Sequence, residues 1–391
     1  MIEDWQHGGF GLYVHWPFCA AKCPYCDFNS HVRHKIVQKQ WLEGYIQELN
    51  RYKTLLPDRV LNSVFLGGGT PSLMDPDIVA SLLESIREAW PISNDLEITL
   101  EANPGSVEAG RFAGYAQAGV NRVSLGVQAL NDDDLKRLGR IHSVNDAVAA
   151  FDIARSNFDR VSFDLIYGRQ DQTLEDWRRE LTIALHMAID HLSLYQLTIE
   201  NGTTFGDRHA RGKLHGLPDE DMSADMYLVT QELCSDAGFL AYEVSNHAKP
   251  GAHSRHNMIY WRYGDYVGIG PGAHGRITRN GDRWATEATG NPEAWLDRLK
   301  TQSTETIHTL IDPREQAVEY VMMGLRLAGG IDLGRLQTLS DDILSAEAQS
   351  RLTDLELIKI SDNMLFATPK GRMILNTLIK ELLLEPQRVR Q

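Results

Sequence analysis

Residues 13–28 read YVHWPFCAAKCPYCDF and place Cys19, Cys23 and Cys26 in the spacing C-x3-C-x2-C. Only one further cysteine, Cys234, exists in the 391 residues. Three thiolates on one short loop can each bind one iron of a cubane iron–sulfur cluster. Because such a cluster has four irons, one iron stays open for a small molecule, much as catalytic zinc sites keep an open position. The run therefore predicts a cluster that reacts rather than one that only carries electrons.

Other uses of these cysteines fit the sequence less well. A structural zinc site needs a fourth ligand at a characteristic spacing, and no second C-x2-C or H-x3-H follows the run. A disulfide framework is typical of short secreted chains, and the segment Met1–Gly11 is acidic and aromatic rather than a signal peptide. Cys234 falls in the helical pattern of residues 227–237 and is interpreted as a small apolar core residue.

Composition restricts the class of protein. The chain is long enough for one large domain and a smaller one, and 42% of its residues are hydrophobic, which supports a sizeable core. Its net charge of −14 argues against a nucleic-acid partner bound through a general basic surface. No apolar run approaches the length of a membrane span. We expect a cytoplasmic protein with reduced thiols, for which peripheral contact with a membrane protein stays open.

Strands and helices alternate over the first two-thirds of the chain. Helical patterns at residues 76–90, 107–118 and 174–188 separate short β-branched runs. These runs are residues 12–15, 63–66, 96–100, 122–125, 161–166 and 191–197. Such alternation predicts parallel βαβ units, and six units favour a partial or complete barrel over a small open sheet.

Polar and glycine residues follow each predicted strand. In order they are the cysteines, the run GGGTPS at 67–72, Glu101-Ala102-Asn103-Pro104, Gly126-Val127-Gln128, and Asp164 ahead of Tyr167-Gly168. Chemistry in such folds gathers on the loops at the carboxyl ends of the strands. The sequence therefore predicts one site on one rim.

The glycine run matches neither G-x-x-x-x-G-K-[ST] nor G-x-G-x-x-G, so nucleotide-phosphate binding is a weak interpretation. Three successive glycines let the backbone approach a ligand closely, whereas an ordinary tight turn needs one or two.

The motif C-x3-C-x2-C with an aromatic residue, Tyr25, before the third cysteine resembles the signature of the radical S-adenosylmethionine (SAM) superfamily. The resemblance implies a [4Fe-4S] cluster whose open iron chelates SAM and whose electron cleaves SAM to a 5′-deoxyadenosyl radical. It also implies SAM contacts at matching positions along the chain. These are Tyr13, Tyr25, Gly68, Gly69, Thr70, Glu101, Gln128, Arg140 and Asp164.

Further segments resemble the group that contains the oxygen-independent coproporphyrinogen III oxidases and the haem chaperones. They are YVHWPFC, GGGTPS, EANPG, VSLGVQ, DLIYG and GDYVGIGPGAHG, and together they span nearly the whole chain. Oxidases of this group carry another cysteine two positions after the third, where this chain has Phe28. They also have an extension before the cluster, whereas Cys19 follows eighteen residues here. Both departures favour the chaperones.

The segment HSRHNMIYW at residues 253–261 contains H-N-x-x-Y-W, which resembles a motif implicated in haem binding by those chaperones. Imidazole is a common axial ligand of haem iron, so His256 is the predicted ligand. Less favoured histidines are His247, His253 and His274, the last of which could line the SAM pocket instead. Arg255 or Arg262 could meet the propionates. A purely structural loop histidine, with Tyr260 and Trp261 packed at the barrel edge, stays an alternative.

The last third changes character. Residues 313–327 and 346–355 are predicted helices, residues 358–367 a hairpin, and residues 373–384 a helix that Pro369 helps to start. This order is winged-helix-like. Winged helices often bind DNA, but the hairpin and final helix carry few bases, and the resemblance makes this part a lid or docking surface.

The predicted fold class is α/β, a partial (β/α)6-type radical SAM barrel over residues 1–290 with a small winged-helix-like α+β domain over residues 291–391. The resemblance implies a haem chaperone that delivers haem to client haemoproteins of the respiratory chain, carrying the cluster and SAM. The alternative is an oxygen-independent coproporphyrinogen III dehydrogenase that decarboxylates propionate side chains. A radical SAM enzyme with an unrelated substrate is a third hypothesis, and a homodimer stays open.

Overall fold

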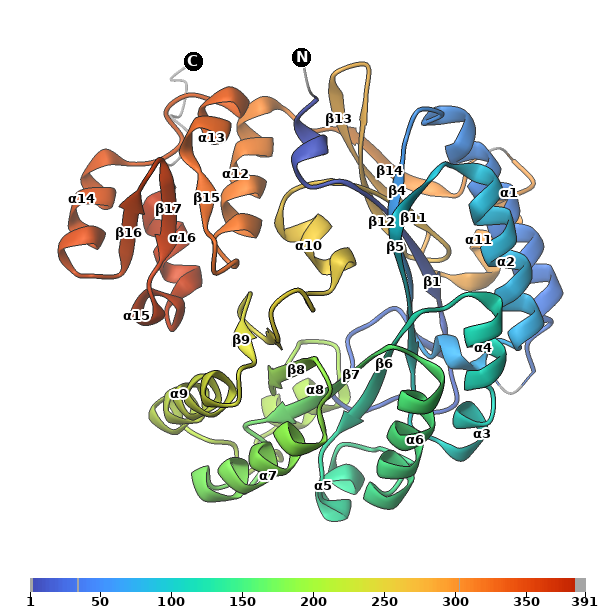
Figure 1. The fold of residues 1–391 in the computed structure, drawn as a ribbon, viewed down its shortest axis with the longest axis horizontal. Helices are drawn as coiled ribbons and strands as arrows, with labels where there is room; N and C mark the ends of the chain where they lie inside the picture. Colours follow the sequence, from blue (N-terminus) through green and yellow to red (C-terminus); the bar gives the residue numbers. More distant parts are fainter. Residues whose placement is uncertain (1–2, 34, 302, 384–391) are drawn as a thin grey trace.

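A computed structural model describes residues 3–33, 35–301 and 303–383. A 12-stranded sheet curves into an arc (Figure 1), in the order β14-β13-β12-β11-β1-β4-β5-β6-β7-β8-β10-β9. The six predicted strands are confirmed, and each pairs in parallel with the next. They are β1 (Phe10–Trp16), β4 (Leu61–Gly68), β5 (Ile92–Ala102), β6 (Arg122–Gln128), β7 (Arg160–Tyr167) and β8 (His191–Gln196).

Further strands, which the sequence did not lead us to predict, extend the arc at both edges. Strand β11 pairs in parallel with β1, and antiparallel strands follow on either side. The added strands are β9 (Leu240–Ala241), β10 (Asn246–Ala248), β11 (Asp265–Ile269), β12 (His274–Arg279), β13 (Asp282–Ala288) and β14 (Glu305–Leu310). A separate two-stranded pair, β2 (Phe18–Cys19) and β3 (His31–Val32), holds the start of the cysteine loop.

Helices cover the convex face of the arc (Figure 1). They are α1 (Gln38–Leu55), α2 (Pro76–Ala89), α3 (Ser106–Ala109), α4 (Phe112–Ala118), α5 (Asp132–Arg137), α6 (Val144–Asn157), α7 (Leu174–Met187), α8 (Thr204–Ala210), α9 (Glu220–Asp236) and α11 (Pro292–Arg298). The single helix predicted at residues 107–118 is wrong, because a turn at Gly110 and Arg111 separates α3 from α4. Glycine is a poor helix former, and the Arg111 side chain donates to the Leu73 carbonyl at 2.8 Å instead of extending a helix face.

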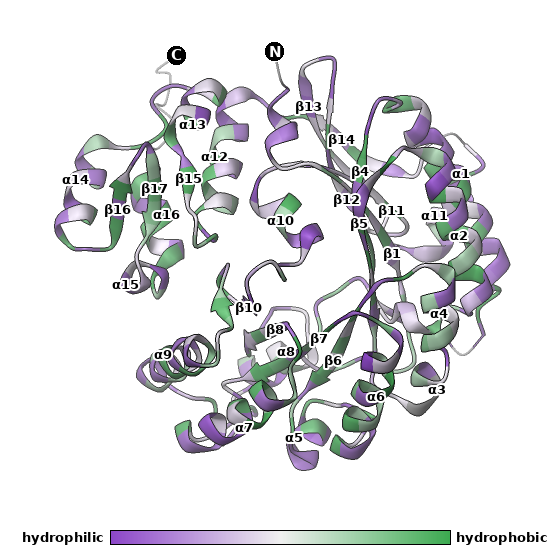
Figure 2. Ribbon diagram, viewed as in Figure 1, coloured by the Kyte–Doolittle hydropathy of each residue, from purple (hydrophilic) through white to green (hydrophobic). Residues whose placement is uncertain are grey.

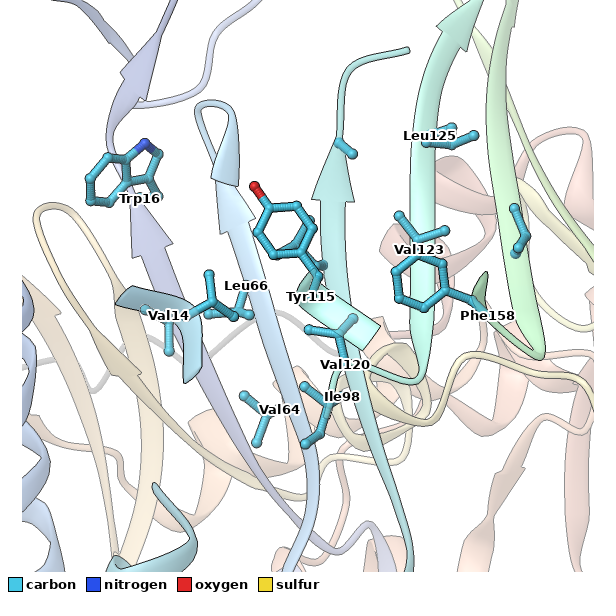
Figure 3. Close-up of a cluster of buried hydrophobic side chains, with 14 of the residues drawn as sticks. Val14, Trp16, Val64, Leu66, Ile98, Tyr115, Val120, Val123, Leu125 and Phe158 are labelled. Carbon is cyan, nitrogen blue, oxygen red and sulfur yellow. The ribbon is translucent and has the colours of Figure 1, made fainter. Parts of the chain in front are cut away.

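The two faces of the central strands differ in chemistry. Alternate residues such as Val14, Val64, Ile98 and Val123 point toward the helices and form the main core (Figure 3). The residues between them point into the arc, since side chains alternate along a strand. The inward set includes Tyr13, His15, Ser63, Phe65, Thr99, Glu101, Arg122, Ser124, Asp164 and Ser193. A parallel sheet buried on both sides would be apolar on both, so the polar inner face marks a functional surface.

One short helix, α10 (Arg255–Trp261), lies inside the arc (Figure 1). The Ser254 side chain caps its first turn by accepting from the Asn257 N–H. The Arg255 N–H donates to Glu97 at 2.8 Å, and Arg160 pairs with the same carboxylate at 2.9 Å. These contacts fix α10 against strands β5 and β7.

The C-terminal part has its own hydrophobic core. Its elements are α12 (Pro313–Gly324), β15 (Ile331–Asp332), α13 (Leu333–Leu339), α14 (Ala346–Asp354), β16 (Ile358–Ser361), β17 (Met364–Ala367), α15 (Pro369–Arg372) and α16 (Leu375–Leu382). Figure 2 shows apolar residues concentrated on β16, β17 and α16. The predicted hairpin is confirmed. The last predicted helix, residues 373–384, corresponds to α16, the separate short helix α15 precedes it, and Leu384 lies outside the described residues.

Ion pairs join this part to the arc. Arg335 pairs with Asp4 at 2.7 Å, and Arg276 on β12 pairs with Glu319 on α12 at 2.7 Å. Strand β14 lies in the large sheet although it follows residue 290. The domain boundary between residues 290 and 291 therefore stays a prediction. Among the described residues, no helix is both long and apolar enough to cross a membrane.

Candidate functional site

The three cysteines lie on one loop at the carboxyl end of β1. Cys19 ends β2 and is buried, whereas Cys23 and Cys26 are partly exposed. The Cys26 N–H donates to the Cys23 carbonyl at 3.2 Å, so a tight turn holds the last two thiols. Burial raises the pKa of Cys19 and Cys26, and the nearby Cys23 thiol raises both further. The loop therefore gathers the three thiols at one place.

Two side chains from distant parts of the chain donate to these thiols, one from the end of β4 and one from the segment after α5. The Thr70 hydroxyl lies 3.5 Å from the Cys19 sulfur, and the Arg140 guanidinium lies 3.4 Å from the Cys23 sulfur. Burial raises the pKa of the Cys19 thiol, and the hydrogen bond from Thr70 works against that rise. Donors of this kind stabilise thiolates, which are the form that binds metal.

This donor set fits a cubane cluster. No group of three or more His, Cys, Asp or Glu side chains in the described part of the chain is arranged around a single metal ion. A cubane needs one thiolate for each of three irons instead, and three free cysteines on one loop can supply them.

The glycine run at the end of β4 packs directly against the cysteine loop. The Gly69 N–H donates to the Trp16 carbonyl at 2.7 Å, and the Thr70 N–H donates to the Phe18 carbonyl at 2.8 Å. A Cβ atom on Gly69 would lie 2.6 Å from the Phe18 carbonyl oxygen. Gly68 has a φ of +108°, which side chains rarely allow. The glycines are thus required by backbone contact as well as by any ligand.

Two partly buried carboxylates face the inside of the arc. Glu101 accepts from the Gly68 N–H at 3.2 Å, and Asp164 lies 3.5 Å from the Ser124 hydroxyl. Burial, and next the charge of Asp164, raise the pKa of Glu101 to about 8. Burial raises the pKa of Asp164 to about 6. Such perturbed carboxylates on a polar inner face are typical of binding sites.

Arg140 links several strand ends. Its guanidinium donates to Asn103 at 2.6 Å and to the Gly126 carbonyl at 2.8 Å, besides the Cys23 sulfur. A cavity of about 240 Å³ opens beside it and is lined by Cys23, Asn103 and Arg140 among others. Residues that follow the first and third predicted strands therefore meet Arg140, which follows α5, at one cavity.

The other predicted SAM residues lie close by. The Tyr13 hydroxyl is 2.9 Å from Nδ1 of His15, whose Nε2 contacts the Asn29 carbonyl at 2.8 Å. Tyr25 packs its ring against Phe205, with centroids 6.5 Å apart. Gln128 adopts a left-handed backbone with a φ of 72°, which breaks the regular pairing of β6 at its end. The cysteine loop, the glycine run and Arg140 are thus in direct contact, whereas Tyr13 lies further back along β1, with its ring 6.3 Å from that of His256.

His256 lies elsewhere, deep inside the arc on α10. Its Nδ1 is 2.7 Å from the Ser63 hydroxyl and its Nε2 is 2.6 Å from the Tyr260 hydroxyl. Its ring stacks on Phe65 with centroids 5.1 Å apart, and its side chain is 1% exposed. Burial, and next the charge of Arg122, lower the pKa of His256 to about 3. The imidazole is therefore neutral, and both of its nitrogens are engaged.

The alternative haem residues differ in accessibility. His253 stacks on Tyr242 with centroids 4.4 Å apart, His247 is buried in β10, and His274 is exposed on β12. Arg255 forms an ion pair with Asp95. None of these contacts identifies an iron ligand.

Some residues of this region gave weak signals in the sequence. Ser63 and Arg122 fall inside apolar strand patterns, where only their polarity at inward positions distinguishes them. Cys234 is buried in α9, and burial raises the pKa of its thiol to about 12, so it is a core residue.

Comparisons with protein families and curated proteins agree with this geometry. The family described as the Radical SAM superfamily matches residues 13–182, and the HemN C-terminal domain matches residues 311–374. The chain is 37% identical to heme chaperone HemW of Escherichia coli (strain K12) over 380 residues, which are 96% of this chain and 98% of the relative. It is 38% identical to the mitochondrial radical S-adenosyl methionine domain-containing protein 1 of Bos taurus over 384 residues, which are 95% and 87% of the two chains.

Among solved structures, coproporphyrinogen III oxidase (HemN) from Escherichia coli, a radical SAM enzyme, superposes with a TM-score of 0.79. The superposition covers 96% of this chain and 92% of that one at 22% identity. It confirms the fold of the arc together with the C-terminal part.

Proposed function

The chain belongs to the HemW family within the radical SAM superfamily, and from this membership we propose that it is a haem chaperone. It binds haem and delivers it to client haemoproteins. The observation that carries the proposal is the similarity to HemW proteins over nearly the full length of both chains.

A local feature supports the chaperone over the oxidase. Phe28 occupies the position where the oxidases of this group have a further cysteine, and its side chain is 58% exposed. A cluster loop with Phe28 offers no fourth thiolate at that position. The similarity to HemN in structure supports the fold alone.

The superfamily carries a [4Fe-4S] cluster and SAM, and the residues described above fit both groups. We assign Cys19, Cys23 and Cys26 to the cluster, which supplies one-electron chemistry and an open iron when bound. The glycine run and Arg140 would hold SAM when it is bound. The partly buried carboxylates Glu101 and Asp164 hold or release protons at the inner side of the site.

The assignment of the haem region rests on α10. His256, which lies on this helix, belongs to the proposed haem site together with the tyrosines around it. The polar inner face of the arc and its aromatic side chains suit a macrocycle with polar substituents.

Several finer features are also part of the proposal. The clients are haemoproteins of the respiratory chain, reached through peripheral membrane contact, and the chaperone acts as a homodimer in the cytoplasm, where its thiols stay reduced. The C-terminal part serves as a lid or docking surface. Because β14 belongs to the large sheet, a boundary near residue 311 suits the described elements better than one at residue 290.

Haem transfer tests the proposal. The cluster-reconstituted protein is loaded with haem under anaerobic conditions and mixed with an apo-haemoprotein of the respiratory chain, and the absorbance of the client is followed. We expect the client to gain haem faster than from free haem. Turnover of coproporphyrinogen III with SAM and a reductant, without haem transfer, would contradict the proposal.

A further inference from the structure

The inside of the arc is open to solvent at its aromatic residues. Tyr195 on β8 is 41% exposed, although it pairs with Ile166 in a register that turns both side chains inward with Asp164. Tyr260 and Tyr266 are partly exposed as well. The interior therefore presents several phenol groups to any ligand that enters it.

The imidazole of His256 is not available to an entering iron. A neutral imidazole has one nitrogen lone pair and one N–H. Between them, the Ser63 hydroxyl at 2.7 Å and the Tyr260 hydroxyl at 2.6 Å occupy both nitrogens. At 1% exposure the ring also has no open edge. Ligation by His256 would require breaking one of these hydrogen bonds and moving Tyr260.

The Tyr260 hydroxyl covers the Nε2 edge of His256. The two residues are four positions apart on α10, so they lie on the same face of the helix. In the described part of the chain the Tyr260 oxygen makes one hydrogen bond, to His256, and so keeps a lone pair free. Its ring packs edge-on against Tyr266 with centroids 4.4 Å apart, which fixes its direction. Tyrosine is a known axial ligand of haem iron.

We propose that Tyr260 is the haem-iron ligand of the H-N-x-x-Y-W segment and that His256 is a positioning residue behind it, oriented in turn by Ser63. The inference rests on the proposed haem-binding function. It accounts for the presence of both a histidine and a tyrosine in the segment, and it places haem in the same interior space as Tyr13, whose ring lies 6.3 Å from that of His256.

The ligation step balances without an oxidant or reductant. The O–H bond of Tyr260 breaks, an Fe–O bond to ferric haem forms, and one proton leaves for the solvent. The imidazole then donates from Nε2 to the phenolate oxygen, while the Ser63 hydroxyl donates to Nδ1. This is the orienting role that hydrogen-bonded partners of metal ligands usually have.

The test is a titration of the cluster-reconstituted protein with ferric haem, followed by absorption and resonance Raman spectra. We expect the wild type to show a phenolate-to-iron signature, and Tyr260→Phe to lose it. Tyr195→Phe, which removes an interior phenol without an imidazole partner, should keep the signature. His256→Ala should keep the phenolate-to-iron signature but bind haem about tenfold more weakly, because one hydrogen bond to Tyr260 is lost. His256→Gln should restore part of the haem affinity.

Three outcomes would overturn the inference. If Tyr260→Phe keeps the wild-type spectrum, Tyr260 is not the ligand. If His256→Ala alone removes the iron ligand, the imidazole is the ligand. If the wild type binds no haem, the proposed function fails first. Should Tyr260→Phe fold poorly by circular dichroism, ring-deuterated tyrosine in the wild type must still shift the phenolate Raman band, and an unshifted spectrum would refute the proposal.

Discussion

Polar side chains gather both at the rim of the arc and on the helix inside it. Those at the rim border an open cavity, whereas His256 on the helix is buried and fully hydrogen-bonded. At the rim, Cys23 and Arg140 border a cavity of about 240 Å³ and are joined by a weak contact at 3.4 Å. Inside the arc, His256 is saturated by two short hydrogen bonds and is almost fully buried. The open rim can therefore bind and release ligands, whereas the two hydrogen bonds of His256 fix the orientation of its ring.

The largest expected effect tests the rim. Replacement of Cys19, Cys23 or Cys26 by Ala removes one of the three thiolates, so each variant should lose the brown chromophore of the reconstituted cluster. Cys234→Ala, in the core of α9, is the matched control and should keep it. Iron content and absorption spectra measure the result. A cluster that survives in any one of the three variants would refute the three-ligand site.

A second test concerns the glycine run. Gly69→Ala places a Cβ 2.6 Å from the Phe18 carbonyl oxygen, so we expect a loss of about 1–3 kcal/mol in the free energy of unfolding together with weaker cluster retention. Gly329→Ala, where the new Cβ meets nothing within 4 Å, should change the stability little. Chemical denaturation compares the two variants. Equal stability would mean that the contact between these loops is not tight.

A third test asks whether Arg140 contributes to SAM binding in a way that a surface arginine does not. Arg140→Lys loses the paired donation to Asn103 and to the Gly126 carbonyl, because lysine lacks the guanidinium fork. We expect SAM to bind about tenfold more weakly to the cluster-loaded variant, measured by equilibrium dialysis. Arg137→Lys, an exposed residue on α5, is the control. An unchanged SAM affinity would remove Arg140 from the site.

A smaller effect tests the helix inside the arc. Ser63→Ala leaves Nδ1 of His256 without its partner at 2.7 Å, which should lower the free energy of unfolding by about 1 kcal/mol. Haem affinity should fall severalfold, since the imidazole can rotate. Ser81→Ala, on the exposed face of α2, is the control. Unchanged haem affinity together with unchanged stability would show that Ser63 does not orient the ring.

A last test depends on pH and lies away from both regions. Burial raises the pKa of Glu48 to about 7, although the Gly270 N–H at 3.1 Å lowers it. The folded state therefore binds the proton more tightly than the unfolded chain, so this contribution to stability is full below about pH 4.5 and is lost as the pH rises to about 7. Glu48→Gln should reduce the change of the melting temperature with pH over this window, whereas Glu84→Gln on the surface should not. If the melting temperature of Glu48→Gln changes with pH in the same way as that of the wild type, the raised pKa of Glu48 is contradicted.

Contiguous patterns made the rim predictable. The cysteine spacing, the glycine run and the residues after each strand lie next to strands whose β-branched character is clear in the sequence, and parallel strands carry their ends to one edge. The long strands and the C-terminal hairpin could be predicted for the same reason. The break between α3 and α4 could not, because it depends on the contact of Arg111 with the Leu73 carbonyl.

The interior of the arc was harder to predict. H-N-x-x-Y-W indicates a histidine and a tyrosine on one helix face, but not which of them faces the solvent. That depends on Ser63 and Phe65, which are 193 and 191 positions away from His256 in the sequence and reach it only through the fold. The edge strands β9 and β10 were also missed, since two- and three-residue strands have no periodicity to detect.

The most direct test of the central claim is an anaerobic titration of the cluster-reconstituted protein with haem, followed by visible absorption. The haem-chaperone account predicts a saturable, roughly stoichiometric shift of the Soret band. An absorption spectrum that stays that of free haem at every ratio, with coproporphyrinogen III consumed in the presence of SAM and reductant, would contradict it.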